Sequence, residues 1–225
     1  MGKLENNIIH CIGDSHVCFF TGDDYKIHAY WPYYIGSNKI FRTYHLGPVS
    51  AYNLCAFNTT TRGRELLLTI FKRLPQKSNI LLVFGEIDCR AHLGKQADLQ
   101  KRKIEDIVQE CVDRYFKVVL EVKNMDFNVG VWGVIPSTNI PCNYGPDHPF
   151  PSYGTCQQRN IITRLFNNYL DELCFQKNII FVSIFEELLN PDLTANLYYF
   201  RDVNHISSNA FPKAFSKIKA AYRLI

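Results

Sequence analysis

The sequence has no uninterrupted apolar run near the ~20 residues that a membrane-spanning helix needs. Its eight cysteines include no Cys-x-x-Cys pair, so neither a zinc ribbon nor a thioredoxin-like redox motif is supported. Internal repeats and low-complexity linkers are also missing, which excludes repeat arrays and disordered chains. The 225 residues are 47% hydrophobic and 20% charged, an ordinary composition for a globular protein. We expect a single domain that spans residues 1–225.

The net charge of +4 says little about binding partners. The densest basic stretch, Lys101 to Lys103, runs directly into acidic residues and is typical of a solvated helix face, so no nucleic-acid partner is expected. The N-terminal segment lacks the apolar centre of a secretory signal peptide, which predicts a cytoplasmic protein with reduced cysteines. A disulfide between Cys142 and Cys156 is the alternative for a secreted chain. The oligomeric state stays open.

Hydrophobic periodicity predicts an α/β protein. Short apolar runs that read as strands cover residues 7–12, 79–84, 127–134 and 178–183, and residues 39–44 alternate between apolar and polar side chains as in a further strand. Apolar residues at helical spacing cover residues 62–74, 102–123, 157–175 and 207–222. Because strands and helices alternate, we expect a central parallel five-stranded sheet with helices on both faces.

Three short polar motifs fall where sites form in such a sheet, at the carboxyl ends of the strands. The segment Gly-Asp-Ser-His (13–16) directly follows the first strand. The segment Gly-Glu-Ile-Asp-Cys-Arg (85–90) directly follows the third strand. The segment Asp-Val-Asn-His (202–205) comes just before the last helix. We therefore expect these motifs to gather at one edge of the sheet.

The residue types in these motifs suit nucleophilic catalysis. A serine at a strand-to-helix turn, Ser15, is exposed beside backbone N–H groups that can stabilise an oxyanion. Its hydroxyl is a poor nucleophile at neutral pH and needs a base, for which His205 is the candidate. Asp202 lies three residues earlier and can hold the other imidazole nitrogen.

The three motifs, in this order along nearly the whole chain, resemble those of the SGNH/GDSL hydrolases. The resemblance implies a flavodoxin-like, three-layer α/β/α sandwich with strand order 2-1-3-4-5. It implies that Ser15 is the nucleophile, His205 the base and Asp202 the residue that orients it, with no metal or cofactor. The variant motifs Gly-Asp-Ser-His and Gly-Glu-Ile-Asp-Cys-Arg resemble a sub-branch associated with glycan-modifying proteins.

The sequence departs from the family pattern around the oxyanion hole. Ile87 stands where the family has an asparagine that donates into the hole, and the loss of one donor typically costs ~10²–10³ in rate. Arg90 is the candidate substitute. A backbone N–H comes from a glycine after the second strand in the family, and either Gly47 or Ser50 matches that place. Asp88 matches a family aspartate that is structural or lies beside the site.

Each feature also has a structural interpretation. Asp14 and Ser15 suit a helix N-cap, and the Asp202–His205 pair suits a surface cap. Metal ligation is an alternative for a set of acidic and imidazole side chains: Glu86, Asp88 and His92. Packing, or the lining of a cleft, is expected for an aromatic set: Tyr25, Tyr30, Trp31, Tyr33 and Tyr34. The long loop at 136–156 is a candidate substrate lid that carries Tyr144, His148 and Tyr153.

We expect a serine esterase that removes a small acyl group, with acetyl as the first choice, from a carbohydrate or related metabolite. The substrate is then a small-molecule or glycan ester. An O-acyltransferase with the same three residues is an alternative, because it shares every step up to deacylation. A non-catalytic glycan- or protein-binding module is another alternative, and Ile87 is the residue that favours it.

Overall fold

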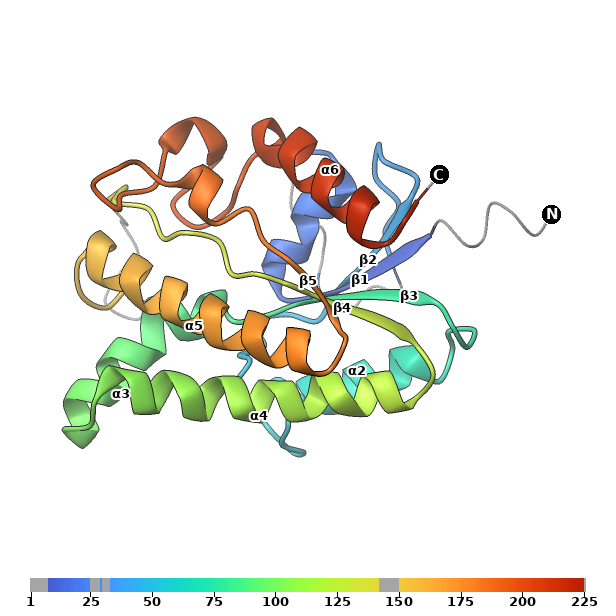
Figure 1. Cartoon of the computed structure of the whole chain (residues 1–225), viewed down its shortest axis with the longest axis horizontal. Helices are drawn as coiled ribbons and strands as arrows, with labels where there is room; N and C mark the ends of the chain where they lie inside the picture. Colours follow the sequence, from blue (N-terminus) through green and yellow to red (C-terminus); the bar gives the residue numbers. More distant parts are fainter. Residues whose placement is uncertain (1–7, 25–28, 30–32, 142–149, 225) are drawn as a thin grey trace.

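The computed structural model describes residues 8–24, 29, 33–141 and 150–224. Its centre is a five-stranded sheet in the order β2-β1-β3-β4-β5, in which every neighbouring pair of strands is parallel (Figure 1). The strands are β1 (Ile9–Gly13), β2 (Phe41–His45), β3 (Asn79–Val83), β4 (Asn128–Trp132) and β5 (Ile180–Val182). The expected strand order and sandwich architecture are confirmed.

Helices cover both faces of the sheet (Figure 1). One face carries α2 (Gly63–Phe71), α4 (Ile104–Asn124) and α5 (Cys156–Gln176). The other face carries α6 (Phe211–Ala221) and the 3-10 helix η1 (Ser15–Thr21). A shorter helix, α3 (Leu93–Gln100), precedes α4. The result is the three-layer arrangement, with one apolar cluster on each side of the sheet.

The central strand β3 explains why its sequence is a continuous apolar run. Ile80 and Leu82 pack into the cluster beneath α4 and α5, whereas Leu81 and Val83 pack into the cluster beneath α6. Successive side chains of a strand point to opposite faces, so a strand that is covered on both sides needs apolar residues at every position.

The segment that follows β3 differs most from the sequence-based prediction. The chain forms a π-helix, η2 (Asp88–His92), which continues directly into α3. Only Leu93 and Ala97 of α3 are buried, so the segment carries too few apolar residues to give a helical pattern. The basic stretch Lys101 to Lys103 is exposed and lies between α3 and α4, not within a helix.

Several sequence-based expectations lie outside the described residues: those for Tyr25, Tyr30, Trp31, Cys142, Tyr144 and His148. The proposed disulfide partner Cys156 is buried, and its Sγ lies 3.1 Å from the carbonyl oxygen of Ser137. The seven cysteines in the described part of the chain form no disulfide. Within the same residues, no helix is long and apolar enough to cross a membrane.

Candidate active site

The turn that follows β1 places Ser15 at the carboxyl edge of the sheet. Asp14 caps η1, with its Oδ1 accepting the backbone N–H of His16 at 2.9 Å. Ser15 is the first residue of η1 and is half-buried. A Cβ atom at Gly13 would collide with the backbone carbonyl of Val83, so glycine allows β1 to approach β3 closely just before the serine.

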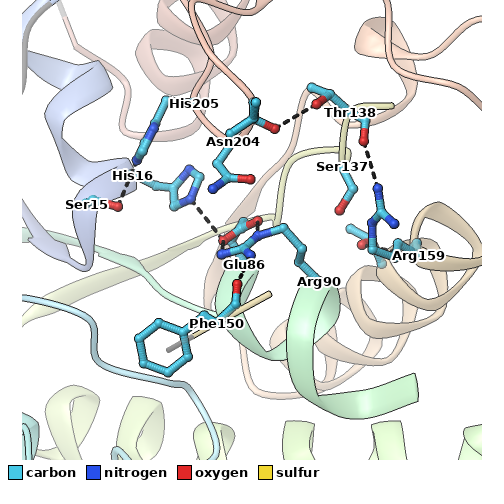
Figure 2. Close-up of polar contacts among 12 residues, drawn as sticks. Ser15, His16, Glu86, Arg90, Ser137, Thr138, Phe150, Arg159, Asn204 and His205 are labelled. Atoms are coloured by element: carbon cyan, nitrogen blue, oxygen red, sulfur yellow. Dashed lines mark hydrogen bonds and ion pairs between the residues drawn. The ribbon is translucent and has the colours of Figure 1, made fainter. Parts of the chain in front are cut away.

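His205 meets Ser15 from the loop that precedes α6 (Figure 2). Ser15 Oγ lies 2.8 Å from His205 Nε2, and His205 Nδ1 lies 2.9 Å from both carboxylate oxygens of Asp202. An ionised carboxylate only accepts, so Nδ1 carries the proton and Nε2 of the neutral ring is left to accept from the serine hydroxyl. The three residues therefore have the order and spacing of a Ser-His-Asp triad.

Asp202 stays ionised at neutral pH. Burial favours its neutral form, but hydrogen bonds from the His205 ring and from the backbone N–H groups of Asn204 and His205 outweigh this effect. Together they hold the pKa of the Asp202 carboxyl well below its usual range. The carboxylate can thus stabilise positive charge on His205.

Hydrogen bonds from neighbouring segments fix the loop that carries His205. The hydroxyl of Thr138, in the loop after β4, donates to the carbonyl oxygen of Val203 at 2.7 Å. The backbone N–H of Arg201 donates to the carbonyl of His205 at 3.0 Å. Phe200 and Ile206 form an antiparallel bridge across the same turn. These contacts hold the imidazole in place before any substrate binds.

A second polar cluster lies behind the Ser15–His205 pair, and sequence reasoning gave no catalytic part to two of its members, His16 and Glu86. Figure 2 shows the His16 ring between that pair and Glu86. His16 Nε2 lies 3.2 Å from one Glu86 oxygen, and Arg90 Nε donates to the other at 2.5 Å. The pairing of β1 with β3 explains why His16 and Glu86 lie side by side. Because Gly13 pairs with Val83, His16 and Glu86 each lie three residues beyond paired positions.

The electrostatics of this cluster favour the charged forms of Glu86 and His16 despite burial. Burial opposes ionisation of Glu86, but Arg90 and the His16 ring outweigh it and hold the pKa of that carboxyl at about 2. Burial also opposes protonation of His16, but Asp14 and Glu86 outweigh it and raise the pKa of the imidazole. Burial raises the pKa of Asp14 to about 6.

Arg90 is engaged in that cluster. Its Nε and Nη2 donate to Glu86, its Nη1 donates to the carbonyl of Phe150 at 2.5 Å, and the residue is buried. These contacts favour a part in fixing Glu86. Donation into an oxyanion hole by Arg90 stays a prediction.

The other candidate binding residues lie around the loop after β2. Asp88 is buried and accepts the backbone N–H groups of Ala51 and Tyr52 at 2.7 and 3.2 Å. Burial outweighs these bonds and raises the pKa of the Asp88 carboxyl to about 7. The hydroxyl of Ser50 accepts the N–H of Asn53, and Ser50 and Asp88 line a cavity of about 290 Å³. The two hydrogen bonds that Asp88 accepts therefore fix the backbone of the loop after β2.

Gly47 follows a residue that is hydrogen-bonded to the end of β1. The N–H of the preceding residue, Leu46, donates to the carbonyl of Gly13 at 2.8 Å, two residues before Ser15. Gly47 itself has a φ of 83°, a conformation that favours glycine over other residues. The hydrogen bond of Leu46 thus holds the start of this loop beside the turn that presents the serine.

The remaining expectations concern metal ligands and aromatic residues. The described residues contain no group of three or more His, Cys, Asp or Glu side chains placed to hold a metal, and the ring of His92 packs edge-on against Phe150. Tyr33 packs against Tyr44 of β2, and Tyr34 pairs with the same strand through its backbone. Tyr153 donates its hydroxyl to Asp98 of α3 at 2.7 Å.

No protein-family model and no curated protein sequence matches this chain. Among solved structures, the chain is similar to a GDSL-like lipase from Bacteroides thetaiotaomicron, with a TM-score of 0.57, 13% identity, and coverage of 97% of this chain and 88% of that one. It is similar to a variant of an acetyl-xylooligosaccharide esterase from Geobacillus, with a TM-score of 0.59, 13% identity, and coverage of 97% and 95%.

A third similar structure is the C-terminal domain of the Drosophila Oskar protein, with a TM-score of 0.56, 11% identity, and coverage of 94% and 86%. At these identities the likeness concerns the fold. The order of the strands agrees with it. The chain has the fold of the SGNH/GDSL hydrolase superfamily.

Proposed function

We propose that the protein is a serine esterase that hydrolyses small acyl esters. The observation that carries this proposal is the continuous contact from Ser15 Oγ to His205 Nε2 and from His205 Nδ1 to Asp202. A helix cap or a surface pair does not require the serine hydroxyl to face the one imidazole nitrogen that can take its proton. The fold of GDSL-like lipases and acetyl esterases adds support.

The reaction has two halves. Ser15 Oγ attacks the ester carbonyl while its proton passes to His205 Nε2, and Asp202 stabilises the imidazolium that forms. The tetrahedral intermediate then expels the alcohol, which takes the proton from His205, and leaves an acyl group on Ser15. In the second half His205 removes a proton from water as water attacks the acyl-serine. The bond to Ser15 Oγ then breaks, His205 returns the proton to Ser15, and the carboxylic acid is released.

The oxyanion is stabilised by the backbone N–H groups of Ser15 and Gly47. The hydrogen bond from Leu46 to Gly13 supports Gly47 in this role, because it brings the loop after β2 beside the turn of the nucleophile. Ser50, the alternative from the sequence, lies three residues further along the loop, where its hydroxyl accepts the N–H of Asn53. Ile87 is buried and has no donor, so the hole contains fewer groups than the family pattern.

We propose an acetyl ester of a carbohydrate as the substrate class. The resemblance of the 13–16 and 85–90 motifs to glycan-modifying proteins supports this choice, as does the fold shared with an acetyl-xylooligosaccharide esterase. Transfer of the acyl group to a sugar hydroxyl uses the same acyl-serine. The ratio of released acetate to acetylated acceptor distinguishes the two reactions.

The test is labelling with a fluorophosphonate probe, read by intact mass, together with hydrolysis of p-nitrophenyl acetate. We expect one adduct on the wild-type protein, and no adduct and a loss of turnover of at least ~10³-fold in Ser15→Ala. Ser78→Ala is the matched control, because Ser78 lies at the opposite, amino end of β3. A folded wild-type protein without an adduct would overturn the proposal and favour the binding module.

A further inference from the structure

The rings of His16 and His205 lie face to face. Their centroids are 4.8 Å apart and their planes differ by 28°. Each ring also has its own carboxylate, since Glu86 lies 3.2 Å from His16 Nε2 and Asp202 lies 2.9 Å from His205 Nδ1. Both imidazoles are buried. A positive charge on one ring therefore raises the free energy of protonating the other, with little water to screen the interaction.

The buried charged groups around His16 favour the protonated form of its ring. The groups that face its ring are Asp14 on the preceding turn, Glu86 and Arg90 beyond β3, and His205 on the loop before α6. At neutral pH, above the pKa of about 6 that burial gives Asp14, two carboxylates and one guanidinium leave a net charge of −1, and buried charge is stable only when it is balanced. A protonated His16 brings the cluster to zero, and its Nε2–H then donates to Glu86. The raised pKa of His16 agrees with this count.

We propose that His16, held as an imidazolium by Glu86, is a positioning residue that disfavours a second positive charge on the stacked ring of His205. This keeps the general base neutral, and ready to accept the proton of Ser15, near neutral pH. The inference rests on the proposed esterase function for its catalytic meaning, but the electrostatic coupling between the two imidazole rings exists whether or not the protein is an esterase.

The arrangement affects both proton transfers. A nearby cation lowers the proton affinity of His205, so the free base persists at lower pH. The imidazolium that forms during attack is then a stronger acid and gives its proton more readily to the departing alcohol. Asp202 opposes the effect and preserves enough basicity for the first transfer. Arg201 Nε lies 3.9 Å from Asp202 and weakens that opposition slightly.

The first measurement uses the unaltered protein, so that it does not depend on any variant folding. NMR titration of the histidine ring signals should show His16 protonated at neutral pH and His205 titrating at lower pH than His16. Detection of His16 as a neutral imidazole at neutral pH would overturn the proposal.

The second measurement removes the charge but keeps the ring. In His16→Phe, and in His16→Gln as a second variant, the pKa of His205 should rise by roughly one unit. The acid limb of kcat/KM should move to higher pH by the same amount. His92→Phe is the matched control, because it removes a half-buried histidine that packs on Phe150 outside the stack, and it should leave both values unchanged.

The outcomes separate this inference from the proposed function. If fluorophosphonate labels Ser15 but the His205 titration is the same in wild type, His16→Phe and His16→Gln, the inference is wrong and the esterase proposal stands. If the His205 titration shifts as expected but Ser15 is not labelled, the coupling between the rings is real and the esterase proposal is wrong.

Discussion

Asp202 holds His205 twice, through its backbone and through its ring. Its Oδ1 accepts the backbone N–H of His205 at 2.8 Å, and His205 Nδ1 lies 2.9 Å from the same oxygen. The carboxylate therefore fixes the turn and the tautomer of the imidazole at the same time. Because the two residues are three apart in the chain, this relationship is local and needs no distant part of the fold. The same carboxylate takes the N–H of Asn204, which leaves the ring little freedom to rotate.

The free energy of unfolding should be greatest in mildly acidic solution. Folding raises the pKa of Asp14 to about 6 and of Asp88 to about 7, from 3.8. Their contribution is present in full below pH 3.8 and is lost as the pH rises through 6 and 7. Glu86 behaves oppositely, with its pKa lowered from 4.5 to about 2, so its contribution is lost as the pH falls. Urea unfolding should give a maximum between about pH 4 and 5.

Asp14→Asn provides the check on this assignment, because it removes one of the two carboxyls whose pKa rises to about 6 and about 7. The loss of stability between about pH 5 and pH 8 should become smaller in this variant. Asp113→Asn, an exposed change on α4, should leave the pH profile as in the wild type. A wild-type stability that climbs steadily over that pH interval would contradict the prediction.

The fold could be predicted from the sequence because its signals are local. Most of the strands are short apolar runs, as in 79–84, and their alternation with amphipathic helices indicates a parallel sheet. The π-helix at Asp88–His92 and the following α3 could not be predicted in the same way. The conformation of these two segments depends on contacts with the loop after β2 and with α5. A π-helix also has no sequence pattern of its own.

The candidate site was predictable in part for the same reason. Two short motifs, residues 13–16 and 202–205, contain Ser15, Asp202 and His205 and can be recognised from the residue types and their spacing. The stack of His16 on His205 joins residues 189 positions apart, and only the folded chain brings those rings together. Arg90 was expected beside the site from its position after β3. Its guanidinium turns instead toward Glu86, because a buried carboxylate one helical turn away is the nearest available partner.

Asp88→Ala should lower stability more than it changes ester binding. The change leaves the backbone N–H groups of Ala51 and Tyr52 without their acceptor, at a cost of about 2–4 kcal/mol in the free energy of unfolding. Asp88→Asn keeps one acceptor oxygen and should lose less. Urea unfolding measures this loss, with Asp113→Ala as the control. A raised KM with unchanged stability would instead place Asp88 in substrate binding.

Ile87→Asn should increase the rate of acyl transfer to Ser15. Ile87 is buried and supplies no donor, and the Nε and Nη atoms of Arg90 are engaged by Glu86 and Phe150. An amide at position 87 restores a donor type that is worth ~10²–10³ in rate when it is well placed, so a gain of roughly tenfold or more in kcat for p-nitrophenyl acetate is expected. Burying the amide should cost about 1–3 kcal/mol of stability.

Ile87→Val is the matched control for this change, because it removes a methyl group and adds no donor. It should leave kcat near the wild-type value. A gain in Ile87→Asn but not in Ile87→Val would establish that the hole lacks one donor, and that the wild-type rate is limited by oxyanion stabilisation. An unchanged kcat in a folded Ile87→Asn protein would contradict the prediction and mean that another group already donates to the oxyanion. Arg90→Lys would then be the next variant, since lysine keeps the charge but loses the paired donors that hold Glu86.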